Sequence, residues 1–206
     1  MHPLPQDLHI HTTFSRHDRA VVPEQTVELV AAIAHARIIG ISDHLESIAD
    51  DFPAYAQTVR SYGFLVGTEV NGADWVGEAV AVDAQYYVYH CRDREEDYRG
   101  AELLLAADKP LIIAHPLMLE TNLRRLPPQC LIEINNRYVW RSNWETLRPF
   151  SASFSFVIDS DAHQPHWLNQ NVARYIAGQL GITETLVFTD ADGSARPRAA
   201  EVSKKF

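Results

Sequence analysis

The chain has 206 residues, of which 46% are hydrophobic and 22% are charged, as in ordinary soluble globular proteins. This length suits a single domain, so we expect residues 1–206 to fold as one unit. The net charge of −9 argues against a general affinity for nucleic acid or anionic membranes. The sequence shows neither a long apolar segment nor a signal peptide, which predicts a cytoplasmic protein without a membrane partner.

Short apolar segments, rich in β-branched residues, predict seven strands. In chain order these strands are 7–11, 38–44, 64–69, 86–90, 111–115, 131–136 and 155–161. Helix-like patterns lie between most of them, and the clearest are 23–37, 92–109, 141–148 and 166–179. The polar segment 190–206 is expected to be loosely held.

The alternation of strand and helix, at a period of roughly 20–35 residues, is typical of successive parallel βα units. The sequence contains neither a glycine-rich phosphate loop nor an obvious second domain. Seven such units therefore favour a closed barrel over an open sheet. We predict an α/β fold of the (β/α)7, TIM-like class, in which the functional residues lie on the loops that follow the strands.

Each predicted strand ends in side chains that can bind a metal ion. They are His9 and His11, Asp43 and His44, Glu69, His90, His115, Glu133 with Asn135 and Asn136, and Asp159 with Asp161 and His163. Parallel strands of one barrel bring these ends to one mouth. Imidazoles mixed with carboxylates suit zinc, manganese or iron better than magnesium or calcium. The sequence therefore predicts a cluster of transition-metal ions.

The metal prediction depends on the whole set, because a single histidine at a strand end is more often a polar cap than a ligand. Among the other polar residues, Asp7 is predicted to orient a ligand imidazole, and Asp43 is expected to have a structural or supporting role. Structural roles are also expected for His2, His35 and His166, and reduced thiols for Cys91 and Cys130.

Six motifs, in this order, resemble those of the polymerase and histidinol phosphatase (PHP) family: DLHIHTTFS, GISDH, GTE, AHP, EINN and SDAH. They span residues 7–163. The resemblance implies a distorted (β/α)7 barrel of the PHP type, with two or three metal ions and phosphoesterase activity. Ser15, Arg16 and His17 are similar in spacing to the trinuclear-zinc phosphatase branch, although many relatives have aspartate in place of Arg16.

The resemblance also implies which residues bind the metal ions. Carried over by position, the ligands would be His9, His11, Glu69 and Asp161 for one ion, Glu69, His90 and His115 for a second, and His17, His44 and His163 for a third. Glu69 would bridge two ions, so Glu69 and Asp161 are candidate catalytic residues as well as ligands. Zinc is the expected metal, with manganese and iron as alternatives.

The expected reaction follows from such ions, since each lowers the pKa of a bound water molecule from 15.7 toward roughly 7. We expect a hydroxide that bridges two ions to attack a phosphomonoester directly, without a phosphorylated enzyme. Arg16 and Arg137 are candidate contacts to the substrate, because guanidinium donors match phosphate oxygens. The expected partner is a small-molecule phosphate ester, and nucleic acid would enter only as a substrate.

Two other functions remain open. An amidohydrolase-like enzyme that cleaves C–N bonds would also begin with an HxH pair, and such enzymes often bridge two metal ions with a carboxylated lysine. Here the first lysine is Lys109, and the bridging position falls to Glu69. A non-catalytic PHP scaffold module would have lost ligands, whereas this set has every expected residue type. The sequence alone decides neither the ester, the metal nor the oligomeric state.

Overall fold

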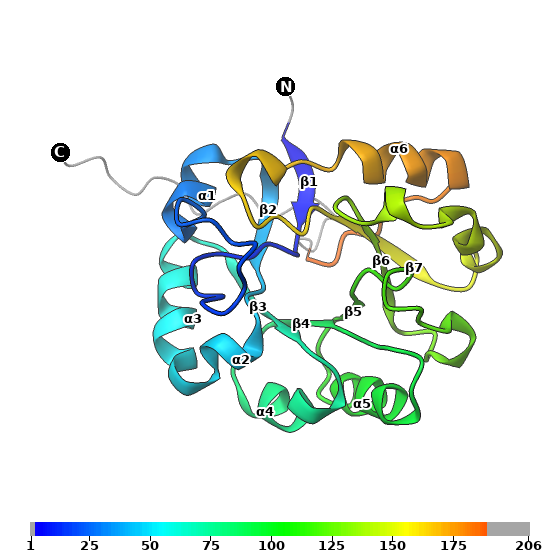
Figure 1. The fold of residues 1–206 in the computed structure, drawn as a ribbon, viewed down its shortest axis with the longest axis horizontal. Coiled ribbons are helices and arrows are strands. Elements are labelled where there is room, and N and C mark those ends of the chain that lie inside the picture. Colours follow the sequence, from blue (N-terminus) through cyan, green and yellow to red (C-terminus); the bar gives the residue numbers. More distant parts are fainter. Residues whose placement is uncertain (1–2, 189–206) are drawn as a thin grey trace.

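A single parallel sheet forms the centre of the computed structural model, which describes residues 3–188. Its strands follow chain order and are β1 (Leu4–Asp7), β2 (Ala36–Ile41), β3 (Leu65–Val70), β4 (Tyr86–Tyr89), β5 (Leu111–Ile113), β6 (Leu131–Asn135) and β7 (Ser155–Asp159). Each neighbouring pair is parallel. The sheet curls until β7 lies beside β1 (Figure 1). The predicted TIM-like architecture is thus confirmed as a nearly closed barrel of seven parallel strands.

The α-helices of residues 3–188 lie on the outside of this barrel (Figure 1). They are α1 (Val27–Ile33), α2 (Leu45–Ile48), α3 (Phe52–Ser61), α4 (Val76–Ala81), α5 (Glu95–Leu105) and α6 (Asn171–Leu180). Short 3-10 helices occupy the loops, namely η1 (Ala49–Asp51), η2 (Ala73–Trp75), η3 (Leu123–Arg125), η4 (Val139–Arg141), η5 (Trp144–Phe150) and η6 (Pro165–Trp167). The sequence patterns located α1, α5 and α6, which are shorter than predicted, and they did not identify α2, α3 or α4.

The ends of α1 show why a helix is shorter than its apolar pattern. The Thr26 hydroxyl accepts a hydrogen bond from the Leu29 N–H at 3.1 Å, and Thr26 itself is extended, so the helix begins at Val27. Ala34 has a left-handed backbone with φ of 55°, which ends the helix. His35, which was expected inside the helix, therefore lies beyond its end.

The predicted helix 141–148 is wrong in type, because this part of the chain forms η4 and η5. Pro149 lies inside η5 and has no N–H to donate, which disfavours a regular α-helix there. The segment instead makes the tight turns of a long loop between β6 and β7. This loop supplies side chains to the end of the barrel at which the strands finish.

Two apolar layers hold the barrel together. Helix residues belong to the outer layer, which lies between the helices and the sheet. The inner layer fills the barrel and consists of Leu8, Ile38, Tyr86, Val88, Ile112, Ala114 and Val157. Tyr86 needs space there, since a Cβ added to Gly67 would lie 2.2 Å from its ring and one added to Gly40 would lie 2.2 Å from its hydroxyl. The Tyr86 hydroxyl donates a hydrogen bond to the Leu8 carbonyl at 2.7 Å.

The seam between β1 and β7 is joined largely by side chains. The Leu8 N–H donates to Asp159 Oδ1 at 2.6 Å, and the Ser160 N–H donates to Asp7 Oδ1 at 3.0 Å. The Gln170 amide donates to the carbonyls of Gln6 and Ile158 at 2.8 and 2.7 Å. Further along the chain, Ile10 pairs with Ala162 in a parallel bridge. These contacts close the barrel where the strand ladder is interrupted.

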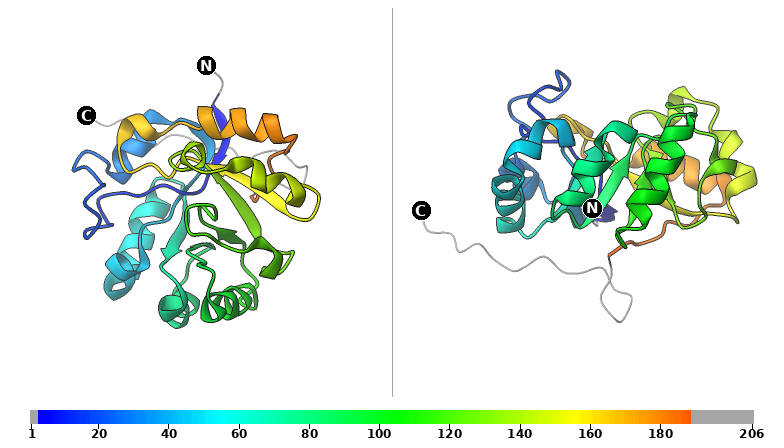
Figure 2. Two further views of the ribbon diagram at one scale, coloured as in Figure 1. Left: turned by 45° about the vertical axis from the view of Figure 1, so that its right-hand side comes forward. Right: turned by 90° about the horizontal axis from the view of Figure 1, so that it is seen from below.

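The loops after β1 and β6 project from the same side of the molecule (Figure 2). This is the side on which the parallel strands end, as expected for the functional face of a barrel. None of the helices within residues 3–188 combines the length and the apolar character that a membrane span requires. The segment 190–206, predicted to be loosely held, and His2 both lie outside the described residues.

Candidate metal centre

Nearly all of the predicted metal ligands meet at the carboxyl ends of the strands. Within the described residues there are three groups of three side chains, and in each group the donor atoms lie within 4.8 Å of one another. The groups are His11, His44 and His163; His9, His11 and Asp161; and His9, Glu69 and His115. His90 joins the last group, because its Nε2 atom is 3.2 Å from Nε2 of His115. Segments far apart in sequence thus converge on one site, which carries every predicted ligand except His17.

Glu69 occupies the centre of this site. Its Oε1 atom is 2.6 Å from His90 Nε2 and 3.1 Å from His9 Nε2. Its Oε2 atom faces the opposite side, 2.8 Å from His44 Nδ1 and 3.4 Å from His11 Nε2. Burial would raise the pKa of this carboxyl, but the surrounding imidazoles outweigh burial and hold it well below its usual range. A carboxylate that presents its two oxygens to different histidines has the geometry of a bridging ligand.

Asp161 lies beside both histidines of the first motif. Its Oδ1 atom is 3.7 Å from His9 Nε2, 3.6 Å from His11 Nε2 and 3.2 Å from His163 Nδ1. The backbone of Asp161 is left-handed, with φ of 52°, and His115 also has a positive φ, of 27°. Such conformations are strained for these residues and persist only where the surrounding structure imposes them. The surrounding structure therefore fixes the backbone at these two predicted ligands.

The spacing of the imidazole nitrogens fits a shared metal ion. Nε2 of His9 lies 3.1 Å from Nε2 of His11, and a similar 3.2 Å separates His90 from His115. Two ligand atoms bound tetrahedrally at about 2.0–2.1 Å would lie roughly 3.3 Å apart. The donor set, imidazoles with carboxylates, is one that zinc, manganese and iron accept. The residues present therefore fit the expected ions.

The neighbouring carboxylates raise the pKa of some of the histidines, whereas burial and neighbouring imidazoles lower the pKa of His11 and His90. Burial opposes a charge on His44, but Glu69 and Asp18 outweigh it and raise its pKa to about 11. His9 likewise has a raised pKa, because Glu133, Asp161 and Glu69 outweigh its burial. Since imidazoles bind metal only when neutral, binding of ions here would release protons.

His17 is the predicted ligand that the structure does not bring to the site. The Asp18 N–H donates to the Ser15 carbonyl at 3.0 Å, and this turn points Arg16 and His17 outward, where both are exposed. Asp18, the next residue, lies in the site instead, and its Oδ2 atom is 2.7 Å from His163 Nε2. The spacing from Ser15 suggested His17, whereas the direction of the turn selects Asp18.

Glu133 holds two of the predicted ligands, and sequence reasoning gave it no such role. Its Oε1 atom is 2.7 Å from His9 Nδ1, and its Oε2 atom accepts a hydrogen bond from the His115 N–H at 2.5 Å. The sequence signal for this role was the position of Glu133 in the EINN motif, near the end of a buried strand. The prediction that Asp7 orients a ligand imidazole is wrong, because Asp7 contacts His35 Nε2 at 2.8 Å.

Asp43 supports the loop after β1, in agreement with the supporting role expected for it. It accepts hydrogen bonds from the N–H and the hydroxyl of Thr12, both at 2.7 Å. It also accepts bonds from the N–H and the hydroxyl of Ser15, at 3.1 and 2.6 Å. Burial raises the pKa of this carboxyl to about 6, although these hydrogen bonds oppose the rise.

Arg137 is the candidate substrate contact that reaches the centre. Its Nη1 atom lies 3.4 Å from Asp161 Oδ1 and 3.0 Å from His163 Nε2, and its guanidinium packs over the ring of Tyr138. Arg16, the other candidate, lies on the exposed turn at the rim. Arg137 therefore places a positive charge beside the donor groups, where an anionic substrate could meet it.

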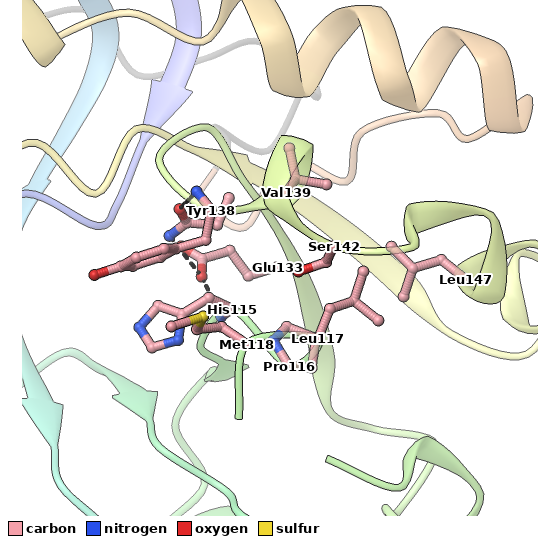
Figure 3. A pocket seen from close by; sticks show the side chains of 10 residues that line it. His115, Pro116, Leu117, Met118, Glu133, Tyr138, Val139, Ser142 and Leu147 are labelled. Atoms are coloured by element: carbon pink, nitrogen blue, oxygen red, sulfur yellow. Dashed lines mark hydrogen bonds between the residues drawn. The ribbon is translucent and has the colours of Figure 1, made fainter. Parts of the chain in front are cut away.

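An apolar pocket adjoins the site on the side of His115 (Figure 3). It encloses about 220 Å³ of unfilled space, part of it open to solvent, and is lined by His115, Pro116, Leu117, Met118, Glu133, Asn135, Tyr138, Val139, Ser142 and Leu147. His115 and Glu133 form its polar wall, and Leu147 lies at its far end (Figure 3). Only about 10 Å³ of this space can be occupied, so the pocket is a narrow apolar crevice with room for roughly one water molecule beside the candidate metal centre.

Comparison with known proteins supports the fold and leaves the chemistry to the site itself. No protein-family model matches this sequence, and no curated protein is similar to it. Among solved structures, the chain is similar to a truncated 3-deoxy-D-arabino-heptulosonate 7-phosphate synthase from Thermotoga maritima, with a TM-score of 0.51 and 11% identity over 87% of this chain and 74% of that chain.

Dihydropteroate synthases are also among the similar solved structures. The protein from Xanthomonas albilineans has a TM-score of 0.49 and 12% identity, over 87% of this chain and 85% of that one. The protein from Yersinia pestis has a TM-score of 0.48 and 13% identity, over 87% of this chain and 84% of that one. At such identities only the comparison with the Thermotoga maritima synthase, whose TM-score is 0.51, bears on the fold, and it indicates a TIM-type barrel. The reaction must be inferred from the side chains at the mouth of the barrel.

Proposed function

We propose that this protein is a metal-dependent phosphoesterase of the PHP type, which hydrolyses a phosphomonoester. The observation that carries the proposal is the position of Glu69, whose Oε1 atom lies 2.6 Å from His90 Nε2 and whose Oε2 atom lies 3.4 Å from His11 Nε2. Divalent ions bound there, zinc being the most suitable, would activate a water molecule and offset the charge of a phosphate group. The ligands would be His9, His11, His44, Glu69, His90, His115, Asp161 and His163.

The residues around the ligands would prepare the site for this chemistry. Glu133 holds the Nδ1 atom of His9, so that Nε2 faces the donor cluster. Asn135 donates to Asp161 Oδ2 at 3.2 Å, and its own carbonyl oxygen accepts from the Arg137 N–H at 2.9 Å. These contacts orient the carboxylate of Asp161 and the start of the loop that carries Arg137.

Arg137 would bind the substrate. Its guanidinium is only partly exposed, and the rings of Tyr138 and Trp167 pack against it at 4.8 and 5.2 Å. A guanidinium held in this way can donate two hydrogen bonds to phosphate oxygens without first being ordered. Arg16, on the exposed turn at the rim, would contact a larger substrate. The PHP resemblance and this pair of arginines together favour a phosphate ester.

Two features argue against the other functions considered for this chain. Lys109 contacts the Val82 carbonyl and the Tyr87 ring, away from the donor groups, so the described residues place no lysine as a bridge between metal ions. Eight of the nine predicted ligands also meet at the site and most of them are buried, whereas a scaffold module without activity has no need of them. Hydrolysis of C–N bonds and a non-catalytic scaffold role are therefore outcomes for the experiment to exclude.

The experiment combines metal analysis with a screen for phosphate release. We expect the purified protein to carry two or three divalent ions and to hydrolyse phosphomonoesters. Exhaustive chelation should abolish the activity, and zinc or manganese should restore it. The variant E69Q should lose at least about 1000-fold in kcat, since one neutral oxygen replaces a shared anionic ligand. E78Q, on the exposed face of α4, is the matched control and should retain full activity.

The proposal fails if phosphate release survives chelation, or if E69Q is as active as the wild type. Turnover of amides alone would identify a C–N hydrolase. Metal binding without turnover of phosphomonoesters, phosphodiesters or amides would identify a binding module.

A further inference from the structure

The loop after β1 is built to hold one residue against the metal centre. Asp43 fixes Thr12 and Ser15 through both their N–H groups and their hydroxyls. The Ser15 carbonyl then accepts the N–H of Asp18 at 3.0 Å, which closes the turn over Arg16 and His17. The position of Asp18 is therefore set by a buried carboxylate from the end of β2, and the loop does not need a metal ion to define it.

The two oxygens of Asp18 have different roles. Oδ1 accepts the N–H of Ala20 at 2.7 Å, which locks the carboxylate in a local turn. Oδ2 is directed into the site, 2.7 Å from His163 Nε2 and 3.3 Å from His44 Nε2. The 3.3 Å spacing to His44 is that of neighbouring ligands around one ion bound at about 2.0–2.1 Å, and the shorter contact to His163 is a hydrogen-bond distance that an ion would lengthen.

The two histidines are oriented so that they meet Asp18. Nδ1 of His44 is 2.8 Å from Glu69 Oε2, and Nδ1 of His163 is 3.2 Å from Asp161 Oδ1. Nδ1 of His163 lies nearer still, at 3.0 Å, to the Asp161 carbonyl. In each ring an acidic residue of the central cluster thus lies beside Nδ1, and Nε2 is the atom that faces Asp18, with Arg137 Nη1 also 3.0 Å from Nε2 of His163. Both Nε2 atoms lie within 3.3 Å of the same carboxylate oxygen of Asp18, so side chains from three separate loops meet at this oxygen.

We propose that Asp18 is the carboxylate ligand of a third metal site, which it forms with His44 and His163. This assignment rests on the metal centre of the proposed function. His17 is then an exposed residue at the rim and is not a ligand, in contrast to the assignment that the PHP resemblance implies. The third site carries one anionic oxygen and imidazole nitrogens, with His11 as a further donor nearby. This composition suits zinc and also accepts manganese and iron.

The experiment compares two neighbouring residues. Metal-free wild type, D18A and H17A are reconstituted with zinc or with manganese, freed of unbound metal, and analysed for metal ions per chain. We expect D18A to lose about one equivalent and H17A to retain the wild-type count. Cobalt substitution gives an independent readout, because the visible spectrum of D18A should lose one component and that of H17A should match the wild type. Thermal melting of the metal-free proteins shows that both variants are folded.

The outcomes separate the assignment from the metal centre itself. Loss of an equivalent in H17A but not in D18A would overturn the assignment in favour of His17. Loss in both variants, or in neither, would also overturn it, because the proposal requires the two neighbours to differ. A wild-type protein that binds no divalent ion would refute the whole metal centre, which is a different result from three ions retained in D18A.

Discussion

At the scale of single residues, the site depends on side chains that hold the ligands as much as on the ligands. Glu133 joins the imidazole of His9 to the backbone of His115. His9 follows β1 and His115 follows β5, on opposite parts of the barrel. Asn135 donates a further bond to the same carboxylate at 3.1 Å. Glu133 therefore receives three donors with two oxygens, and its negative charge is well suited to that arrangement.

Replacing Glu133 with glutamine should weaken metal binding. The amide retains one acceptor oxygen but presents an NH₂ group to the other donor, so His9 or the N–H of His115 loses its partner. We expect metal affinity to fall by about 10–100-fold, the usual effect of losing a group that orients a ligand. Titration against a chelator of known affinity measures this change. E102Q, on the exposed face of α5, should bind metal normally. Equal affinity in E133Q would show that the bond to His9 is not needed.

At the scale of elements, the barrel interior is fitted to one large side chain. Tyr86 is fully buried, and its ring passes over Gly67 on β3 and reaches Gly40 on β2. An inner core of only a few side chains cannot rearrange around an extra atom without moving a strand. Glu69 is two residues beyond Gly67 on the same face of β3, so a displacement of β3 at Gly67 would also move the Glu69 side chain.

The variant G67A should therefore be less stable than the wild type. Its added methyl carbon would lie 2.2 Å from the Tyr86 ring, so we expect a loss of about 1–3 kcal/mol in the free energy of unfolding. Urea denaturation of the metal-free protein measures the change. The matched control is G178A, because Gly178 lies inside α6 with no atom within 4 Å of an added Cβ. That variant should gain about 0.5–1 kcal/mol. A G67A protein as stable as the wild type would contradict the close packing of Tyr86.

At the scale of the whole molecule, the barrel closes through buried carboxylates at the seam of β1 and β7. Asp7 and Asp159 each accept a backbone N–H across this seam, and Glu133 lies close enough to interact with Asp159. Burial raises the pKa of Asp159 well above its usual range, and the charges of Glu133 and Asp7 add to the rise. The closure of the fold is thus linked to pH.

Replacing Asp159 with asparagine should stabilise the metal-free protein at neutral and alkaline pH. A carboxyl whose pKa is raised by folding holds its proton more tightly when folded, so the contribution of Asp159 to the stability of the wild type falls as pH rises above about 4. The loss is at most about 1.4 kcal/mol per pH unit, up to the folded pKa. Asparagine does not titrate, and its oxygen can still accept the Leu8 N–H. The advantage of D159N should therefore grow from pH 4 to pH 8.

Unfolding curves at several pH values, recorded with a chelator present, test this expectation. D50N, at an exposed site in η1, is the control and should follow the wild type across the same range. A D159N protein that is less stable than the wild type at pH 8 would show that the charged form of Asp159 supports the seam.

The sequence by itself determined the architecture and most of the candidate site. Apolar β-branched runs located all seven strands, because strands buried on both faces are nearly continuous in apolar character. The polar residues at the ends of those runs identified eight of the donors, which the structure brings together. This worked because parallel strands of one barrel all end at the same mouth, so position along a strand already implies position in space.

Only the tertiary structure decided the parts that depend on how loops turn and which distant side chains meet. Asp18 lies in the site in place of His17 because Asp43 holds Thr12 and Ser15, which are 31 and 28 residues away in sequence, and so fixes the turn that carries both residues. His9 meets Glu133 rather than Asp7, and Asp7 instead closes the seam and contacts His35. Local sequence patterns do not encode such contacts, because their energy comes from groups that become neighbours only when the barrel closes.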